Sequence, residues 1–184
     1  GAAGAQDSGS AGGGKAPGNA GRTRMGGGAD DLARMDWLEN YIFPAEAEVV
    51  DSAFVRAGTR LAALEMIRGG TTTFADMYYF EDDVAWVVHD AGLRGVLGET
   101  ILDNPTPDSA TADDALAYTE TFLQNWADHP RVTPAVAPHA PYTVGPETLR
   151  KAAELARRYD APLIIHLAET QEEMWTIRSR YDAT

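Results

Sequence analysis

The feature that most constrains the fold is a regular alternation of short β-type segments with longer helical patterns after residue 70. Four apolar or β-branched segments are predicted strands, and a helical pattern follows each of them: strands 71–77, 94–101, 131–138 and 162–169, and helices 81–91, about 111–128, 146–159 and 170 onward. Each unit takes roughly 25 to 40 residues, which suits right-handed crossovers in a parallel sheet. A doubly wound sheet and a (β/α)8 barrel both fit this pattern.

The residues at the segment borders support the predicted helices. Asp51 and Ser52 can cap a helix that runs to about Arg68, where two glycines follow as a stop. Pro146 suits the first turn of the helix 146–159. Upstream, apolar residues spaced near the helical period predict a further helix over about 30–42, which Pro44 closes.

The composition limits the possible partners. The 184 residues carry a net charge of −13, which argues against nucleic-acid binding and against adhesion to anionic membranes, because both need a basic face. There is no Cys, so a metal site must use carboxylates and the four histidines, which are His89, His129, His139 and His166. No apolar run approaches transmembrane length, and no signal peptide is evident. We therefore expect a cytoplasmic enzyme or enzyme segment.

The first 28 residues are rich in Gly, Ala and Ser, and Met25 is their only large apolar side chain apart from proline. Such a segment cannot bury enough apolar surface to offset the entropy lost on ordering. It is predicted to be disordered, so the folded domain is expected to span residues 29–184.

Polar side chains stand at the end of every predicted strand, and this favours a barrel mouth over a single crevice. They are Asp76, Glu99, His139, and His166 with Glu169. No glycine-rich phosphate-binding loop follows any of the strands, so a fold that binds a nucleotide cofactor is disfavoured. His166 and Glu169 lie where the last predicted strand ends, just before a helix start marked by Thr170 and Glu173. They could be a metal ligand and its acid/base partner. The alternative is a histidine hydrogen-bonded within the fold at a strand end and a solvent-exposed Glu.

The other candidates have plainer interpretations. His89 lies on a predicted helix and His129 precedes a proline, so surface or capping roles are expected for both. For Asp76, structural hydrogen bonding to the next loop is favoured over contact with a pocket. His139, which lies between Pro138 and Pro141, is harder to assign a purely structural role.

Five segments, in this order, together resemble the amidohydrolase superfamily, within it the branch of 5-methylthioadenosine/S-adenosylhomocysteine deaminases and related chlorohydrolase-like enzymes. They are ADDL…WLENYIFPAEAE (29–48), EMIRGGTTTFADMYYF (65–80), AGLRGVLGETILD (91–103), HPRVTPAVAPHAPYTV (129–144) and PLIIHLAET (162–170). The resemblance implies an α/β fold, a partial (β/α)8 TIM barrel of the metal-dependent hydrolase type with about strands 2–5 and their helices. It also implies hydrolytic deamination of a purine nucleoside such as 5-methylthioadenosine or S-adenosylhomocysteine.

The resemblance also implies roles for single residues. His166 matches a ligand of the divalent metal, usually zinc, and Glu169 matches the Glu that carries protons between the metal-bound water and the substrate ring. His139 matches a substrate-contacting His, and Glu46 matches the residue that binds the ribose hydroxyls. Trp37 matches an aromatic wall of the substrate pocket.

The sequence also departs from the family pattern. The His-x-His pair expected before residue 29 is absent, and the chain stops at Thr184, before the strands that carry another His and the metal-binding Asp. Glu99 stands where some relatives place an Arg for the homocysteine carboxylate, which argues against that substrate. The alternatives are therefore an amidohydrolase acting on guanine, a pyrimidine or a triazine, or a catalytically incomplete barrel fragment that could self-associate.

Overall fold

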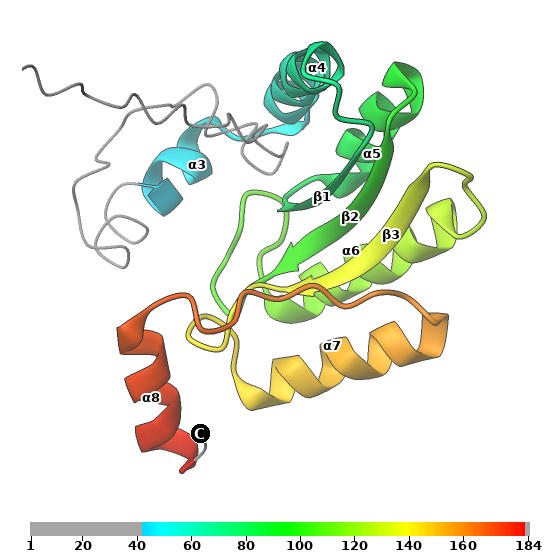
Figure 1. Cartoon of the computed structure of the whole chain (residues 1–184). Coiled ribbons are helices and arrows are strands. Elements are labelled where there is room, and N and C mark those ends of the chain that lie inside the picture. The colour runs from blue at the N-terminus through cyan, green and yellow to red at the C-terminus, as the bar shows by residue number, and fades with distance from the viewer. Residues whose placement is uncertain (1–41, 183–184) are drawn as a thin grey trace, which may run out of the picture.

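The computed structural model describes residues 42–182, which form a parallel sheet covered on one side by helices (Figure 1). The sheet order is β1-β2-β3, and its strands are β1 (Thr73–Tyr78), β2 (Arg94–Ile101) and β3 (Val132–Pro138). Both strand pairs are parallel, and Tyr78 on β1, Glu99 on β2 and Val136 on β3 lie side by side. The carboxyl ends of the three strands therefore meet at one edge of the sheet.

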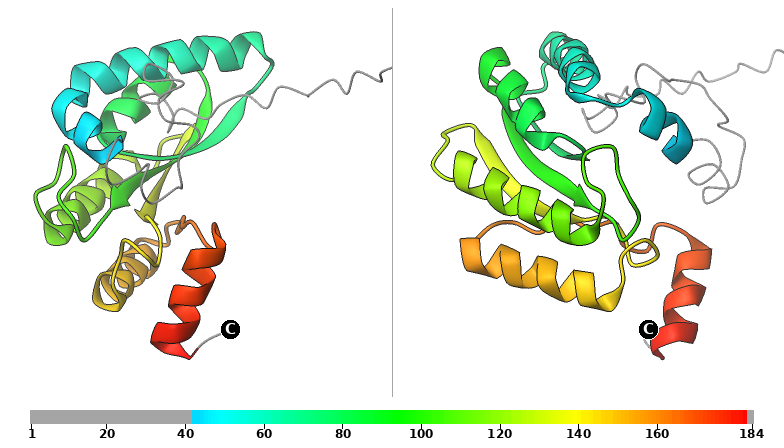
Figure 2. Two further views of the ribbon diagram at one scale, coloured as in Figure 1. Left: turned by 90° about the vertical axis from the view of Figure 1, so that its left-hand side faces the viewer. Right: turned by 180° about the vertical axis from the view of Figure 1, so that it is seen from behind.

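The helices identify the architecture, because α5, α6 and α7 all lie on the same face of the sheet (Figure 2). Their bounds are Glu81–Ala91, Ala112–Trp126 and Pro146–Tyr159, and α4 (Ser52–Arg68) packs against α5. A doubly wound sheet would place helices on both faces, whereas a barrel places every helix outside. The arrangement is that of consecutive β/α units of a barrel wall.

Most predicted helix borders are confirmed, and the local chemistry explains them. Oδ1 of Asp51 accepts the Phe54 amide at 2.7 Å and caps α4, and Thr111 caps α6 in the same way. Gly92 ends α5 with a φ of 77°, a left-handed conformation that glycine adopts at little cost. Pro146 lies in the first turn of α7.

Two predictions about the chain before α4 need comment. Pro44 lies in the first turn of α3 (Phe43–Val49), where the missing amide hydrogen of proline costs nothing. The predicted helix 30–42 falls almost wholly outside the described residues. The predicted disordered segment 1–28 lies outside them entirely.

The prediction of a regular fourth strand over 162–169 is wrong. The chain does run parallel to β3: Ile164 donates to the Val136 carbonyl and His166 to the His139 carbonyl, both at 2.9 Å. Only one bridge pair, Val136 with Leu163, has the geometry of a sheet. One reason is that Pro162 has no amide hydrogen to donate to a neighbouring strand. In addition, no further strand within residues 42–182 pairs with the segment 162–169. The apolar side chains of this segment are therefore not covered on both faces, and Leu163 is 41% exposed.

The core lies between the sheet and the helices. One cluster joins β1 and β2 to α4 and α5 through Val55, Phe74, Val84, Val88 and Leu97, and a second joins β3 to α6 and α7. Along β1 and β2, every second side chain faces the helices. Asp76 therefore lies on the same face as Phe74, and Glu99 lies on the same face as Leu97. Asp76 and Glu99 therefore lie under the helices and not on the open face, as strand periodicity requires.

Candidate active site

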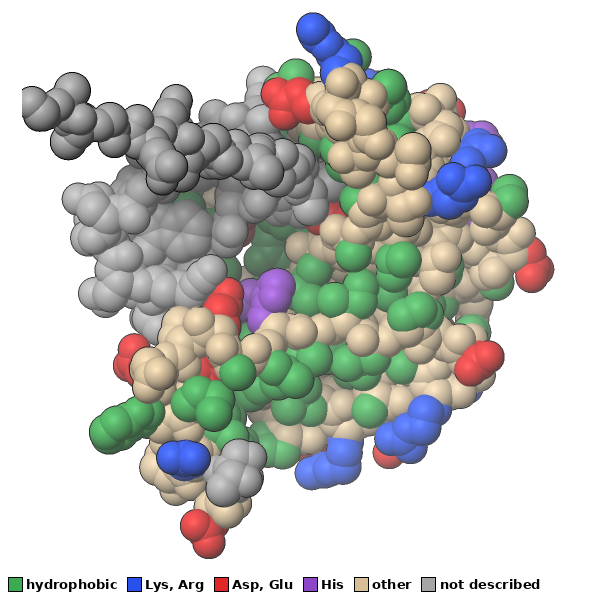
Figure 3. Space-filling view, in the orientation of Figure 1, with side chains coloured by type: hydrophobic (Ala, Val, Ile, Leu, Met, Phe, Trp, Pro, Cys, Tyr) green, Lys and Arg blue, Asp and Glu red, His purple; other side chains and the backbone are tan. Residues whose placement is uncertain are grey.

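Two histidines meet at the carboxyl end of β3. The rings of His139 and His166 lie nearly perpendicular, with centroids 5.2 Å apart, and the His166 amide donates to the His139 carbonyl at 2.9 Å. His139 comes from the loop after β3, and His166 from the segment beside it. Figure 3 shows histidine side chains on the open face, next to hydrophobic side chains that run across the sheet. The predicted meeting of these two residues at one edge of the sheet is confirmed.

A threonine orients the ring of His139. The Thr143 hydroxyl lies 2.7 Å from Nδ1 of His139 and 3.2 Å from the Ala140 carbonyl oxygen. This hydrogen bond holds the imidazole against its own loop, and which of the two atoms donates depends on the tautomer of His139.

Glu169 is linked to the same loop through a tyrosine. The Tyr142 hydroxyl donates to Oε2 of Glu169 at 2.7 Å, and the rings of Tyr142 and His139 are in edge contact with centroids 5.8 Å apart. Loop 139–143 thus connects the predicted substrate-contacting histidine with the predicted proton carrier. The two strand-end turns thus form one polar unit, which consists of His139, Tyr142, His166 and Glu169.

The turn that carries Glu169 is held from behind by Glu173. Ala168 has a φ of 55°, an unfavourable conformation for a residue with a side chain, and the turn needs support. The buried carboxylate of Glu173 accepts the amides of Ala168 at 3.0 Å and Glu169 at 2.7 Å. Thr170 in turn caps α8 (Gln171–Tyr181) by accepting the Glu173 amide. The predicted Thr170–Glu173 helix start is confirmed, and it also fixes the backbone of Glu169.

Glu46 occupies a buried position on α3. It is 4% exposed, and its Oε1 accepts the Tyr78 hydroxyl at 2.8 Å. Tyr78 ends β1, so this bond ties α3 to the carboxyl end of the sheet. Trp37, the other predicted substrate contact, lies outside the described residues.

The described residues do not make a complete metal site on their own. Within residues 42–182, no group of three His, Cys, Asp or Glu side chains is placed to hold a metal ion. His166 fits a single imidazole ligand, since it lies at the carboxyl edge of the sheet and faces its open side. Catalytic zinc takes three protein ligands and a water, so the other ligands would have to come from outside this range.

A second group of carboxylates holds the N-terminus of α5. The amide of Phe80, whose φ is 56°, donates to Asp108 at 2.7 Å, and the amide of Glu81 donates to Glu99 at 3.0 Å. The Glu99 carboxylate therefore serves as a helix cap, and it is fully buried. It lies away from the open face, so it neither supplies nor blocks a substrate contact there.

Burial changes the ionisation of this group. Desolvation raises the pKa of Glu81 well above its usual value, and the charges of Asp76 and Asp108 raise it further. Desolvation also raises the pKa of Glu99, with Asp108 as the next cause. Neither oxygen of Glu81 has a hydrogen-bond partner among residues 42–182, so this side chain is destabilising when it is charged.

The remaining two histidines form a separate structural pair. Nδ1 of His129 accepts the amide of Val132 at 3.0 Å, and Nε2 lies 2.9 Å from Nδ1 of His89. His129 thus caps the start of β3, at the opposite end of the strand from His139. The predicted capping or surface roles are confirmed.

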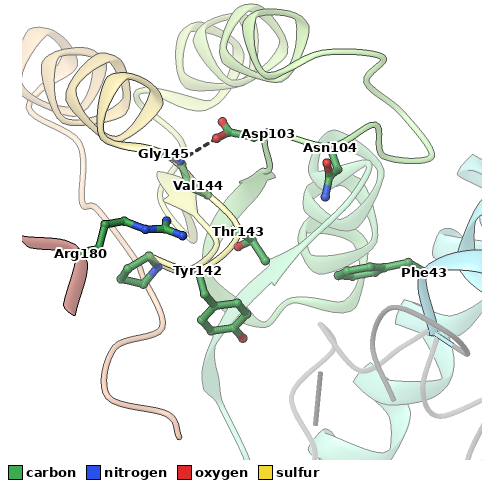
Figure 4. Close-up of a pocket in the computed structure, with 9 residues that line it drawn as sticks. Phe43, Asp103, Asn104, Tyr142, Thr143, Val144, Gly145 and Arg180 are labelled. Atoms are coloured by element: carbon green, nitrogen blue, oxygen red, sulfur yellow. Dashed lines mark hydrogen bonds between the residues drawn. The ribbon is translucent and has the colours of Figure 1, made fainter. Parts of the chain in front are cut away.

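A pocket of about 440 Å³ opens beside this polar unit (Figure 4). Its lining comes from α3, from the loops after β2 and β3, and from α8: Phe43, Asp103, Asn104, Pro141, Tyr142, Thr143, Val144, Gly145 and Arg180. Tyr142 is shared between this pocket and the contact with Glu169. The pocket therefore borders the side chain that contacts Glu169.

Sequence reasoning missed three residues of this site. Tyr142 and Thr143 follow His139 in the HAPYT stretch, and their closeness to the histidine in the sequence could have indicated that they belong to the same site. Glu173 was recognised as part of a helix start only. Its contact with the Glu169 amide depends on the left-handed turn at Ala168, which no sequence pattern predicts.

Comparison with known proteins gives a consistent result. The sequence profile of the Amidohydrolase family matches residues 22–182. The chain is 50% identical over 145 residues to 5-methylthioadenosine/S-adenosylhomocysteine deaminase 1 of Syntrophus aciditrophicus, covering 79% of this chain and 33% of that protein. It is 46% identical over 153 residues to 5-methylthioadenosine/S-adenosylhomocysteine deaminase of Syntrophobacter fumaroxidans, covering 83% and 35%. It thus spans about a third of the length of these relatives.

Among solved structures, the chain resembles a zinc-bound adenosine deaminase from Xanthomonas campestris. The TM-score is 0.83 at 37% identity, over 90% of this chain and 37% of that one. In the part of the chain that the structure describes, no helix is both long and apolar enough to cross a membrane. The sequence match and the one-sided helical covering of a parallel sheet agree, and the chain belongs to the amidohydrolase family.

Proposed function

We propose that these residues form part of the active site of a metal-dependent aminohydrolase that deaminates a 5′-modified adenosine. The reaction replaces the amino group of the adenine ring with oxygen: the nucleoside and water give the hypoxanthine nucleoside and ammonia. The observation that supports this most directly is the meeting of His139, His166 and Glu169 at one sheet edge, joined through Tyr142. The deaminase names of the relatives support this class of substrate.

Glu169 is the proposed proton carrier. Its carboxylate is exposed toward the open side, and one oxygen is oriented by the Tyr142 hydroxyl at 2.7 Å. A carboxylate held in this way can take a proton from the attacking water and give it to a ring nitrogen, a role typically worth about 100- to 10,000-fold in rate. Glu173 keeps the backbone of Glu169 in place during the transfer.

His139 and Glu46 are the proposed substrate contacts. With Nδ1 of His139 hydrogen-bonded to Thr143, Nε2 is the ring nitrogen left to contact a substrate. Glu46 can accept bonds from ribose hydroxyls, and the Tyr78 hydroxyl fixes its orientation. Trp37 is proposed as an aromatic wall for the base.

His166 is the proposed metal ligand of this chain. A neutral imidazole suits zinc, and zinc lowers the pKa of a bound water to about 7. The protein groups described above bind and orient the nucleoside, and Glu169 moves the protons. The remaining metal ligands are expected from outside residues 42–182.

A chimera tests this proposal. Residues 42–182 would replace the aligned stretch of the Syntrophus aciditrophicus relative, which supplies the other two thirds of the barrel. We expect loss of adenine absorbance with 5-methylthioadenosine, and at least about a 100-fold lower kcat in Glu169→Gln. Glu172→Gln, an exposed residue in the first turn of the following helix α8, is the matched control.

Guanine and a triazine would be assayed in parallel. Turnover of one of these and not of the adenosine would assign a different base to the site. A folded chimera that turns over none of them would refute the proposed function.

A further inference from the structure

Asp103, in the loop after β2, holds the end of the loop that connects β3 to α7 (residues 139–145). Oδ2 of Asp103 accepts the Gly145 amide at 2.7 Å, and Oδ1 accepts the Thr148 hydroxyl at 2.7 Å. The Asp103 amide also donates to the Thr143 carbonyl at 3.2 Å. Figure 4 shows the Asp103 carboxylate reaching the Gly145 amide. Three bonds from one residue therefore join the loop after β2 to the end of this loop and the start of α7.

Helix α7 has no side-chain cap of its own, and Asp103 supplies one from another element. The N-cap residue of α7 is Gly145, which has no side chain to accept an amide. A carboxylate stabilises a helix N-terminus, because it accepts a free amide there and lies at the positive end of the helix dipole. A Cβ added at Gly145 would lie 3.0 Å from Oδ2 of Asp103, closer than an ordinary van der Waals contact. The absence of a side chain at position 145 therefore gives the carboxylate access to this amide.

The other end of the loop 139–145 is held by the sheet. The His139 amide donates to the Ile101 carbonyl at 3.1 Å, and the His139 carbonyl accepts the His166 amide at 2.9 Å. Tyr142 lies between the two ends and follows the last residue that the sheet holds. Loss of the Asp103 bonds should therefore move Tyr142 more than His139.

We infer that Asp103 is a positioning residue for the deamination, which acts on Glu169 through Tyr142. By fixing the end of the loop, Asp103 keeps the Tyr142 hydroxyl at 2.7 Å from Oε2 of Glu169. The route is indirect, because the bonds of the Asp103 carboxylate go to the N-cap amide and the first turn of α7. This inference rests on the proposed function for the role of Glu169 as the proton carrier.

The first test needs no activity. In NMR of the 184-residue chain with isotope-labelled Glu carboxyl carbons, the Glu169 signal reports its bond to Tyr142, and Tyr142→Phe gives the shift that follows loss of this bond. We expect Asp103→Ala to move the Glu169 signal in the same direction. Thr111→Ala, which removes the side-chain cap of α6, is the control for the loss of a helix cap and should leave the signal in place. An unchanged Glu169 signal in Asp103→Ala would overturn the inference.

Kinetics of the chimera provide the second test. Asp103→Ala should lower kcat for 5-methylthioadenosine by about 3- to 10-fold and leave KM within about twofold, since the sheet still holds His139. Asp103→Asn should restore most of the loss, because its oxygen can accept the Gly145 amide and its NH2 group can donate to the Thr148 hydroxyl. A raised KM that Asp103→Asn does not restore would instead show that the Asp103 charge contacts the substrate, and the inference would be wrong.

A double-variant cycle determines whether Asp103 acts through Tyr142. If it does, Asp103→Ala should change kcat by less than about twofold when Tyr142→Phe is already present. Losses that multiply would mean that the two residues act separately, which contradicts the inference. A chimera that deaminates nothing, while Asp103→Ala displaces the Glu169 signal in the 184-residue chain, would overturn the proposed function alone.

Discussion

The hydroxyl of Tyr142 donates to Oε2 of Glu169 at 2.7 Å, and this bond joins the loop after β3 to the turn before α8. The two residues lie 27 positions apart in the sequence and on different strand-end turns. Because Tyr142 also borders His139 and the pocket, a single side chain orients the proposed proton carrier and lines the neighbouring pocket. The site therefore depends on the relative placement of two loops more than on either motif.

Removing this bond should slow catalysis without abolishing binding. In the chimera, Tyr142→Phe keeps the ring and deletes the hydroxyl, so we expect kcat for 5-methylthioadenosine to fall by about 10-fold, equivalent to about 1.4 kcal/mol. Steady-state kinetics measure it, with Tyr181→Phe as the control. An unchanged kcat would show that Glu169 is oriented by other groups.

The support of the Glu169 turn can be tested without activity. Glu173→Ala removes two bonds to backbone amides, so we expect faster hydrogen exchange at Ala168 and Glu169 and a loss of about 1–2 kcal/mol in unfolding free energy. Exchange followed by NMR on the 184-residue chain is the measurement. Glu172→Ala should leave both amides protected, and similar exchange in the two variants would count against this role.

The 184-residue chain alone should not deaminate 5-methylthioadenosine, even with added zinc. The sequence contains only four histidines, and two of them, His89 and His129, lie at the opposite end of the sheet. His139 and His166 do not complete a three-ligand site within residues 42–182. A spectrophotometric assay with His166→Ala as control is the measurement. Turnover that the control abolishes would reveal ligands not recognised here.

Replacing Glu81 should stabilise the fold at high pH. Its folded-state pKa lies above the unfolded value, so the native state binds the extra proton and stability declines as pH rises from about 4.5 toward the folded pKa. We expect Glu81→Gln to raise the unfolding free energy at pH 8 and to change it little at pH 4.5. The measurement is the melting temperature between pH 4.5 and pH 8, with Glu154→Gln, at an exposed position, as the control. If Glu81→Gln changed the melting temperature equally at both pH values, the titration of Glu81 would not be responsible.

The His89–His129 pair predicts a second pH effect of opposite sign. Desolvation lowers the pKa of His129, and His89 and Arg131 lower it further. Its stabilising contribution is therefore complete above the unfolded value of about 6.5 and is lost as pH falls through the folded pKa. His129→Asn keeps an acceptor for the Val132 amide but does not titrate. We expect a smaller drop in melting temperature between pH 7.5 and 5.5 in this variant, and an identical drop would exclude His129 as the cause.

Much of the fold could be predicted from local chemistry. The cap at Asp51, the left-handed stop at Gly92 and the first-turn proline at Pro146 are properties of neighbouring residues, so the sequence locates the helix borders. At Pro44 this logic did not predict α3, because proline suits both the end of one helix and the first turn of the next. The prediction of a strand over 162–169 was wrong, since strand formation depends on partners that a linear pattern does not contain.

The sequence by itself determined the β/α rhythm, the family, and the identity of His139, His166 and Glu169 as the chemically capable residues at strand ends. Only the tertiary structure decided which way each strand-end side chain points and what it contacts. Glu99 and Asp76 are strand-end carboxylates like Glu169, yet the two-residue period and the register with Tyr78 turn them under α5. The contacts of Tyr142 with Glu169 and of Asp103 with Thr148 arise between distant segments, and such contacts follow from chain packing in three dimensions.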